Sequence, residues 1–252
     1  MSHADRFLGR AEVYAAARPG YPGALGAWLR DLGLLGTGVA DLGAGTGLFT
    51  RLLLEYGATV TAVEPNADMR AQLLRALNSL VQAGQLKVQA GTSEATGLAA
   101  GSVGLVTAAQ AAHWFDPRPT VRELRRILRP GGRVVLVWND WRGVDEPFNR
   151  AYGDVVRRHS APDTPEGITR SPDAELAILL PGGLEHHTFE NPLRLSRERL
   201  QALAGSISYL PAPGAPGAAS MARDLDVLFD THAADGTVVL TYHTHAYLGQ
   251  LD

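Results

Sequence analysis

The sequence predicts an α/β fold in which a mostly parallel sheet carries helices on both of its faces. Three observations predict it. Short β-branched runs alternate with helical patterns from residue 22 to residue 138, a glycine-rich turn follows the first buried run, and 252 residues, 45% of them hydrophobic, suffice for one sizeable core. Strands that alternate with helices in this way are joined by right-handed crossovers and lie parallel.

Composition excludes several classes of protein. A net charge of -3 gives no general attraction to nucleic acid or to an anionic membrane surface. Without cysteine, the chain makes neither disulfides nor thiolate metal sites. The first 20 residues hold no apolar run typical of a signal peptide, and no stretch approaches the roughly 20 apolar residues that span a bilayer. We therefore expect a soluble cytoplasmic protein with no membrane or nucleic-acid partner.

The first predicted elements run from a helix through a turn to a second strand. Apolar residues at helical spacing predict the first helix, and two glycines then separate it from a short buried strand. The helix after the turn ends before Gly57, which occupies the position of a C′ glycine. The elements expected here are a helix at 22–34, a strand at 39–42, a helix at 48–55 and a strand at 59–64.

The next elements complete five strands. Asn66 is a typical N-cap residue for a helix whose leucines form one stripe. An arginine-rich helix ends at a Pro-Gly-Gly turn, directly before the fifth strand. The elements expected here are a helix at 67–82, strands at 87–91 and 102–108, a helix at 118–129 and a strand at 133–138.

Beyond Trp138 the alternation weakens. Residues 139–185 are rich in proline, glycine and charge, and only 147–159 has a clear helical pattern. A connection of this length is usually functional, so we expect a lid or a substrate-facing insertion there. The single domain is thus divided into a cap and first helix at 1–36, a core at 37–138, the insertion at 139–185, and at 186–252 a completion of the sheet with strands at 186–195 and 237–247 and helices at 196–206 and 218–233.

The strongest local signal is the run Asp41-Leu42-Gly43-Ala44-Gly45-Thr46-Gly47. A buried strand enters a glycine-rich turn that opens a helix, an arrangement that binds ligands at the carboxyl edge of α/β sheets. The run has no lysine, which excludes a Walker loop, and Leu48 stands where the dinucleotide fingerprint has its third glycine. The Asp41 carboxylate suits a ligand with an ammonium group better than a diphosphate, which favours a bare helix N-terminus. A purely structural turn is the alternative.

Glu64 supplies a second acid, 17 residues past Gly47 and at the end of the second strand. An acid at this place accepts hydrogen bonds from both hydroxyls of a ribose. By itself it equally suits a partner for the dipole of the helix after Asn66. Together with Asp41 and the turn, it favours a nucleotide site.

These residues resemble a known family. DLGAGTG followed by AVEPN is similar to motif I and the acid after it in class I S-adenosylmethionine (SAM)-dependent methyltransferases. Further segments resemble the methyltransferase type 11 branch that includes trans-aconitate methyltransferase-like proteins: YAAARPGYP, GTSEATGL, AAQAAHWFD, LRPGG and VWN. The resemblance implies a Rossmann-like seven-stranded sheet of order 3-2-1-4-5-7-6 with the last strand antiparallel, SAM as cofactor and S-adenosylhomocysteine (SAH) as product.

Position by position, the resemblance also implies the cofactor contacts. The turn and Asp41 would hold the methionine moiety, and Glu64 would bind the ribose. Thr92 and Ser93 stand where many relatives have Asp-Ala, and Gly104 replaces a frequent aspartate, so the adenine contact departs from the usual pattern. The implied cofactor residues are Arg18, Asp41, Gly43, Ala44, Gly45, Gly47, Glu64, Pro65, Met69, Thr92, Ser93, Gln110 and Ala111.

The methyl acceptor is expected beside the segment that follows the fourth strand. Methyl transfer from a sulfonium is an in-line displacement, for which the protein aligns the acceptor and excludes water. A carboxylate acceptor needs no general base, whereas a hydroxyl often does. His113 is therefore the candidate catalytic residue, as a base or as a group that orients an acidic acceptor; a structural histidine is the alternative. The candidate substrate residues are Tyr14, Tyr21, His113, Trp114 and Trp138.

Two other functions stay open at this point. An NAD-dependent oxidoreductase uses a similar fold, although Leu48 argues against it. A SAM-binding protein without catalysis would explain the departures at Thr92 and Gly104. His243 and His245 share one strand face, but no third ligand neighbours them, so no metal is expected. The expected partner is a small-molecule methyl acceptor, with a carboxylate or hydroxyl as the methylated group.

Overall fold

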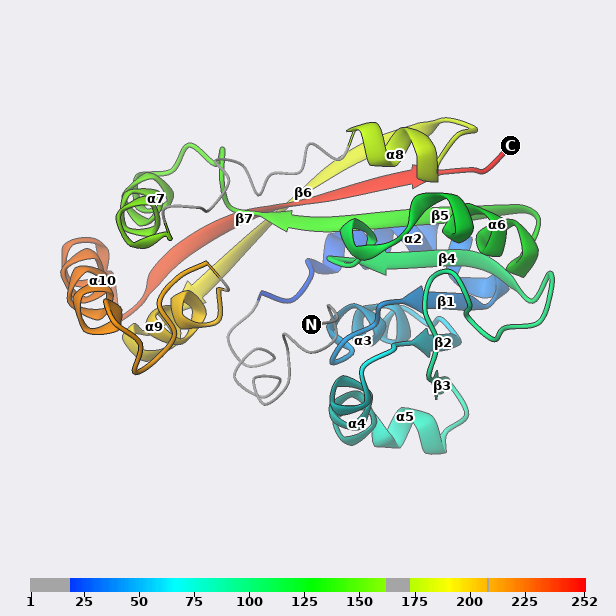
Figure 1. Ribbon diagram of the computed structural model, residues 1–252, viewed down its shortest axis with the longest axis horizontal. Helices are drawn as coiled ribbons and strands as arrows, with labels where there is room; N and C mark the ends of the chain where they lie inside the picture. Colours follow the sequence, from blue (N-terminus) through cyan, green and yellow to red (C-terminus); the bar gives the residue numbers. More distant parts are fainter. Residues whose placement is uncertain (1–18, 162–172, 208) are drawn as a thin grey trace.

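A seven-stranded sheet runs through the whole molecule (Figure 1). The computed structural model describes residues 19–161, 173–207 and 209–252. The strand order is β3-β2-β1-β4-β5-β7-β6; the first five strands are parallel, and β7 is antiparallel to both β5 and β6. The strands are β1 (Val39–Leu42), β2 (Val60–Val63), β3 (Leu86–Gln89), β4 (Val103–Ala109), β5 (Leu128–Asp140), β6 (Leu184–Leu195) and β7 (Val238–Gly249). The predicted fold class is confirmed.

Helices cover both faces of this sheet and one of its ends (Figure 1). Among the described residues the α-helices are α2 (Gly23–Asp31), α3 (Leu48–Glu55), α4 (Ala67–Ala76), α5 (Asn78–Gln82), α6 (Pro117–Ile127), α7 (Pro147–His159), α8 (Asp173–Leu179), α9 (Arg197–Gly205) and α10 (Ala218–His232), and the 3-10 helices are η2 (Leu34–Thr37) and η3 (Ala112–Trp114). In the part of the chain that the structure describes, no helix is both long and apolar enough to cross a membrane.

Three apolar cores hold these layers together. The first packs α2, α3 and α4 on one face of the sheet, and the second packs α6 and α8 on the other. A third core lies beyond the carboxyl ends of the parallel strands, where α7, α9 and α10 pack on the outer halves of β6 and β7. The carboxyl edge of the parallel strands therefore faces a helical cluster built by the second half of the chain.

One face of β7 serves two of these cores. Its even-numbered residues share a face because side chains alternate along a strand. Ala246 and Leu248 belong to the first core, and Leu240 and Tyr242 belong to the third. Between them Thr244, which is fully buried, donates to Oδ1 of Asn139 at 2.6 Å.

The structure corrects the single helix predicted at 67–82. Asn66 caps α4 as expected, its Oδ1 accepting from the amides of Asp68 and Met69 at 2.9 and 3.0 Å. The chain leaves the helical region at Leu77 (φ -121°), whose side chain is buried, and resumes as the short helix α5, which buries no residue fully. The predicted stripe is thus divided between two helices, and Leu77 at the break packs in the first core.

The fifth strand is longer than the predicted 133–138. Val103 pairs with Leu128 and Leu105 with Arg133, so the Pro-Gly-Gly turn is an irregularity inside β5 and not a loop before it. At the other end Asp140 still pairs with His243 of β7. The first two residues of the expected insertion thus belong to the sheet, and α8 is a helix that the sequence pattern did not predict.

Gly104 has a steric explanation. A Cβ at this position would lie 2.2 Å from Oγ1 of Thr37, so no larger side chain fits unless η2 moves. Packing against η2 therefore accounts for glycine at residue 104.

Candidate functional site

The glycine turn between β1 and α3 has the geometry that its composition predicts. Gly43, Gly45 and Gly47 all have positive φ, at 66°, 57° and 88°. A Cβ on Gly43 would lie 2.6 Å from Cβ of Ala111, and one on Gly47 would lie 2.9 Å from Cγ of Leu73. A Cβ on Gly45 would meet nothing within 4 Å. The outer two glycines thus permit close packing, whereas Gly45 borders open space.

Asp41 lies beneath this turn, fully buried at 1% exposure. Its Oδ2 accepts from the Thr50 hydroxyl at 2.6 Å and its Oδ1 from the Thr107 hydroxyl at 2.8 Å. Burial raises the pKa of Asp41 to about 6, although both hydroxyl bonds act to lower it. The two threonines, from α3 and β4, were not singled out by the sequence because neither belongs to a recognisable motif.

Glu64 reaches the same turn from the end of β2. Its Oε2 accepts from the Gly45 amide at 2.9 Å and its Oε1 from the Asn66 amide at 2.8 Å. Burial raises the pKa of this carboxyl above its ordinary value, against these two backbone bonds. Each oxygen retains acceptor capacity, because a carboxylate oxygen takes more than one hydrogen bond. The structure therefore brings the two predicted acids to one glycine turn.

The segment after β4 borders the turn from the other side. Gln110 has a positive φ of 56°, uncommon for a residue other than glycine, and reverses the chain at the end of the strand. Its amide donates to the Val137 carbonyl at 2.8 Å, and its Nε2 donates to the Asn139 carbonyl at 3.0 Å. Ala111, directly after it, is the residue that packs against Gly43.

The two aromatic residues that follow are partly open to solvent. His113 is half-buried, and its ring lies 4.7 Å from the ring of Trp114, centroid to centroid. Trp114 is 43% exposed, which is high for a tryptophan. This exposed pair stands at the carboxyl end of β4, where an acceptor was expected.

The structure describes the other predicted cofactor residues with mixed outcomes. Met69 is buried at the start of α4, and Pro65 is exposed at the end of β2. Thr92 is exposed after β3, but the Ser93 hydroxyl donates to Oε1 of Glu94 at 2.7 Å and is buried beside Thr120. Ser93 is thus turned toward α6, and its contact with adenine stays a prediction.

Gly20, close to the first described residue, lies at the carboxyl end of β5. The Gly20 carbonyl accepts from Nδ2 of Asn139 at 3.1 Å and from Nδ2 of Asn191 at 2.9 Å. The Tyr21 ring packs edge-on against Phe49, with centroids 4.8 Å apart. Tyr14 and Arg18 lie outside the described residues. The polar contacts at Gly20 therefore attach this part of the predicted cap to the end of β5 and to β6.

Trp138, His186 and His245 lie on the α6 side of the sheet, whereas His187 lies on the other side, with its ring 4.6 Å from that of Trp28. The Trp138 ring meets Tyr247 edge-on at 5.7 Å and packs with the second core. Nε2 of His186 lies 3.0 Å from Nδ1 of His245, and burial followed by the charge of His186 lowers the pKa of His245. Within residues 19–161, 173–207 and 209–252, no group of three or more metal-ligating side chains is placed to hold an ion.

The residues at the turn fit a ligand that is both a nucleoside and a cation. Open space at Gly45 admits the ligand close to the backbone. The ionised form of Asp41 supplies negative charge under the turn, and the Glu64 oxygens are acceptors for paired hydroxyls. SAM combines a ribose with an ammonium and a sulfonium group. The acceptor oxygens of Glu64 and the negative charge of Asp41 therefore match the chemistry of SAM.

The chain is similar to known methyltransferases. A family model described as "Methyltransferase domain" matches residues 40–136. An uncharacterized methyltransferase-like protein of Schizosaccharomyces pombe is 30% identical over 204 residues, which are 78% of this chain and 75% of that protein. An uncharacterized methyltransferase of Mycobacterium tuberculosis is 40% identical over 150 residues, 60% of this chain; the match spans 58% of the mycobacterial protein.

Similarity extends to solved structures. A protein described as a type II methyltransferase from Anaeromyxobacter dehalogenans is 26% identical, with a TM-score of 0.72 over 93% of this chain and 98% of that chain. The similarity therefore includes the outer halves of β6 and β7 with their helices, beyond the 40–136 region that the family model covers.

Proposed function

Because the chain belongs to the class I SAM-dependent methyltransferases, we propose that it transfers the methyl group of SAM to a small-molecule acceptor. The observation that carries the proposal is the meeting of Asp41 and Glu64 at one glycine turn, with Gly45 bordering open space. The parallel pairing of β1 with β2 brings the two strand ends that carry these acids to the same turn.

In the proposed complex, SAM would supply an electrophilic methyl group bonded to its sulfonium sulfur. The sulfur would leave as the neutral thioether of SAH when the methyl group is transferred. The turn from Gly43 to Gly47 holds the methionine moiety, with the Asp41 charge beneath it. Glu64 accepts from the ribose hydroxyls while it keeps its bond from the Gly45 amide. Gln110 and Ala111 border the cofactor from the β4 side, at the position that Ala111 already occupies against Gly43.

The acceptor is expected at the exposed His113–Trp114 pair. Its nucleophile must lie in line with the sulfur–methyl bond, so the main work of the protein is alignment and exclusion of water. An acidic acceptor needs only orientation, which the half-buried His113 supplies as a hydrogen-bond donor. A hydroxyl acceptor instead hands its proton to the neutral imidazole as the bond to the methyl forms.

Calorimetry with SAH tests the cofactor site. The parent is expected to bind, and Glu64→Ala and Asp41→Ala are each expected to lose on the order of 1.5–3 kcal/mol of binding free energy, the value of a charge-assisted hydrogen bond. Glu55→Ala is the matched control, because Glu55 is an exposed acid at the far end of α3. No binding by the parent at millimolar SAH, or equal binding by all variants, would sink this assignment.

Transfer of tritiated methyl from SAM to a panel of carboxylic acids and phenols tests the reaction. Turnover is expected with at least one class. If His113 acts as a base, His113→Gln lowers the rate by about 10²–10⁴ with a phenol and leaves carboxylate methylation within about tenfold. SAH binding with no turnover on any acceptor would favour a SAM-binding protein without catalysis, and saturable NADH binding would favour the oxidoreductase.

A further inference from the structure

Loop 90–102, which joins β3 to β4, lies at the same edge of the sheet as the glycine turn. Its first part is a tight turn, closed by the Thr92 and Ala95 amides and carbonyls at 3.2 and 3.3 Å. A Cβ on Gly91 would lie 2.8 Å from Cγ1 of Val63, so the loop packs directly against β2. Loops after parallel strands frame the ligand in this kind of fold.

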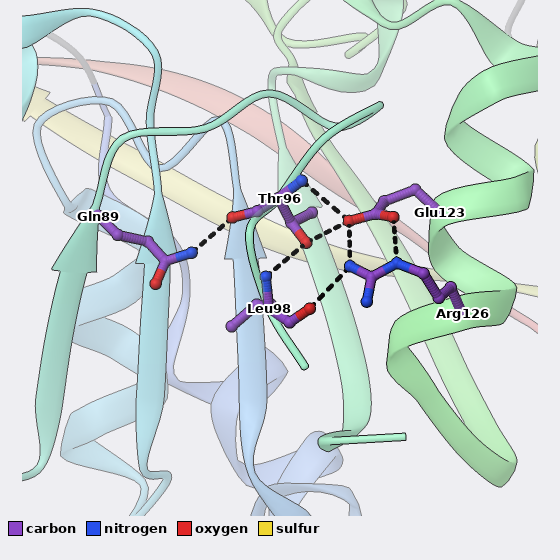
Figure 2. A network of polar contacts seen from close by, with 5 residues as sticks. All are labelled: Gln89, Thr96, Leu98, Glu123 and Arg126. Atoms are coloured by element: carbon purple, nitrogen blue, oxygen red, sulfur yellow. Dashed lines mark hydrogen bonds and ion pairs between the residues drawn. The ribbon is translucent and has the colours of Figure 1, made fainter. Parts of the chain in front are cut away.

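The base of this loop is fixed to α6 by a carboxylate. Figure 2 shows Glu123 reaching from α6 to Thr96, whose amide and hydroxyl donate to its Oε1 at 2.9 and 2.5 Å. Arg126 binds both oxygens of Glu123 at 2.7 Å and donates to the Leu98 carbonyl at 2.7 Å. The Arg126 hydrogen bond is the main reason why the pKa of Glu123 falls to about 2.

A second carboxylate, Glu94, joins the turn of the loop to the start of α6. Its Oε1 accepts from the Ser93 hydroxyl at 2.7 Å and from the Asp116 amide at 3.0 Å. The Thr120 hydroxyl in turn donates to Ser93 at 3.1 Å. Partial burial acts to raise the pKa of Glu94, but bonds from Thr92, Ser93 and Asp116 outweigh it and lower the pKa. Glu94 is therefore ionised at neutral pH.

Asp116 is also the end of the segment that carries His113 and Trp114. The start of that segment is fixed at Gln110, which is bonded to the end of β5. Its other end is held at Asp116, whose amide donates to Glu94 and whose carbonyl accepts from the Thr120 amide of α6 at 3.1 Å. The loop after β3 and the segment after β4 meet at one carboxylate oxygen.

We propose that Glu94 is a positioning residue that transmits cofactor binding on loop 90–102 to the acceptor-side segment 110–116. This inference rests on the proposed function and on the expectation that Thr92, which is exposed on this loop, faces the cofactor. A ligand that orders the loop also orders Glu94, and Glu94 holds the Asp116 amide. Acceptor binding is then favoured after the cofactor has bound. Glu123, by contrast, holds the base of the loop whether or not a ligand is present.

Hydrogen–deuterium exchange of the full chain, with and without SAH, tests the proposal in the parent, Glu94→Ala, Glu94→Gln and the control Glu55→Ala. In the parent, SAH is expected to slow exchange at 43–47 and at 112–121. In Glu94→Ala, protection at 43–47 persists, whereas the gain at 112–121 falls by about tenfold, as expected for loss of a hydrogen bond to a charged acceptor. Glu94→Gln restores most of the gain, because its amide oxygen still accepts from Asp116.

The free protein supplies an independent measurement. Without ligand, residues 112–121 of Glu94→Ala should already exchange faster than those of the parent, at a melting temperature close to that of the Glu55→Ala control. Equal exchange of 112–121 in parent and Glu94→Ala, with or without SAH, overturns the proposal while leaving the methyltransferase assignment intact. Absence of SAH protection at 43–47 in the parent overturns both.

Discussion

At the scale of single residues, Asp41 stands out because its burial works against its charge. A pKa of about 6 in the folded chain, against 3.8 for a free aspartate, means that the folded state binds a proton more tightly than the unfolded state. The folded state therefore loses stability as the pH rises from about 4 to about 6, by up to about 3 kcal/mol for a shift of this size. Above that window the ionised carboxylate is retained at a cost, which is typical of a functional group.

Asp41→Asn should expose this cost. At pH 7.5 the variant is expected to be as stable as the parent or more so, because the amide needs no desolvated charge and the Thr50 and Thr107 hydroxyls can reorient to it. Lowering the pH to 5 should stabilise the parent relative to the variant. Urea denaturation of both proteins at the two pH values measures the difference. A free-energy gap independent of pH would show that Asp41 does not titrate in this range.

The same titration should affect the ligand. If the ionised carboxylate attracts the ammonium group of SAH, affinity for SAH falls as the pH drops below about 6 in the parent. In Asp41→Asn, affinity is weaker at pH 7.5 and changes less between pH 7.5 and 5. Calorimetry across this range measures both curves. Parallel curves for parent and variant would place the ammonium group elsewhere.

Single residues also show how far the sequence predicts the site. Asp41, the glycine turn and Glu64 were predictable because each lies near or just after the end of a short buried strand, and parallel pairing brings such strand ends together. Thr50, Thr107 and Glu94 were not, since a hydroxyl inside a helix or strand, or a glutamate in a loop, has no local pattern that reveals a distant partner. Whether the predicted residues bind SAM is a matter for the SAH titrations above.

At the scale of elements, α7 is attached to the sheet by one buried amide. Asn149 donates to the Thr241 carbonyl at 2.7 Å and to the Trp141 carbonyl at 2.9 Å, and it accepts from the Thr241 amide at 3.1 Å. The last residue of β5, Asp140, pairs with His243 of β7, so β5 does not extend as far as Thr241. The Asn149 side chain bonds the backbone of Thr241 in the place that a continued β5 would occupy.

Asn149→Ala should therefore destabilise the fold by about 2–4 kcal/mol, because the backbone groups of Thr241 lose their partner in a buried place. The exposed Asn78 at the start of α5 provides the matched control, and Asn78→Ala should change stability by less than about 1 kcal/mol. Chemical denaturation of both variants gives the comparison. Equal effects would mean that water replaces the amide at the edge of β7.

Elements were predicted best where a glycine or a proline borders a periodic segment. The helices at 48–55 and 147–159 have the predicted bounds: the first follows Gly47 and the second begins at Pro147. The helix at 67–82 breaks where tertiary packing buries Leu77, and β5 lengthens because β7 continues beside it. Both differences come from contacts with distant parts of the chain, which local propensity does not contain.

At the scale of the whole molecule, the structure shows what the helix of the expected lid at 139–185 packs against. Its helix α7 packs with α9 and α10 in the third core, next to the carboxyl edge of the parallel strands. Residues 162–172 lie outside the described chain. We still predict that the insertion at 139–185 and the segment before residue 22 cover the acceptor and exclude water during transfer.

Limited proteolysis measures such a cover. Cleavage of the ligand-free protein is expected within 139–185 or before residue 22, and SAH together with an acceptor should slow it. The α7 helix itself should resist cleavage in both states, because four of its apolar residues are buried in the third core. Identical cleavage rates with and without ligands would indicate a rigid insertion.

The buried Thr244 has a consequence for how this molecule can change shape. The first and third apolar cores share one face of β7. The Thr244 hydroxyl, which donates to Asn139, lies between them on that face. Next to that border, Asn139 and Asn191 hold the incoming chain at Gly20. Because these hydrogen bonds separate the two apolar cores, substitutions in one core are expected to leave the packing of the other unchanged. Under the proposed function, substitutions in the third core, nearer the expected acceptor, should therefore leave the first core and the cofactor turn unchanged.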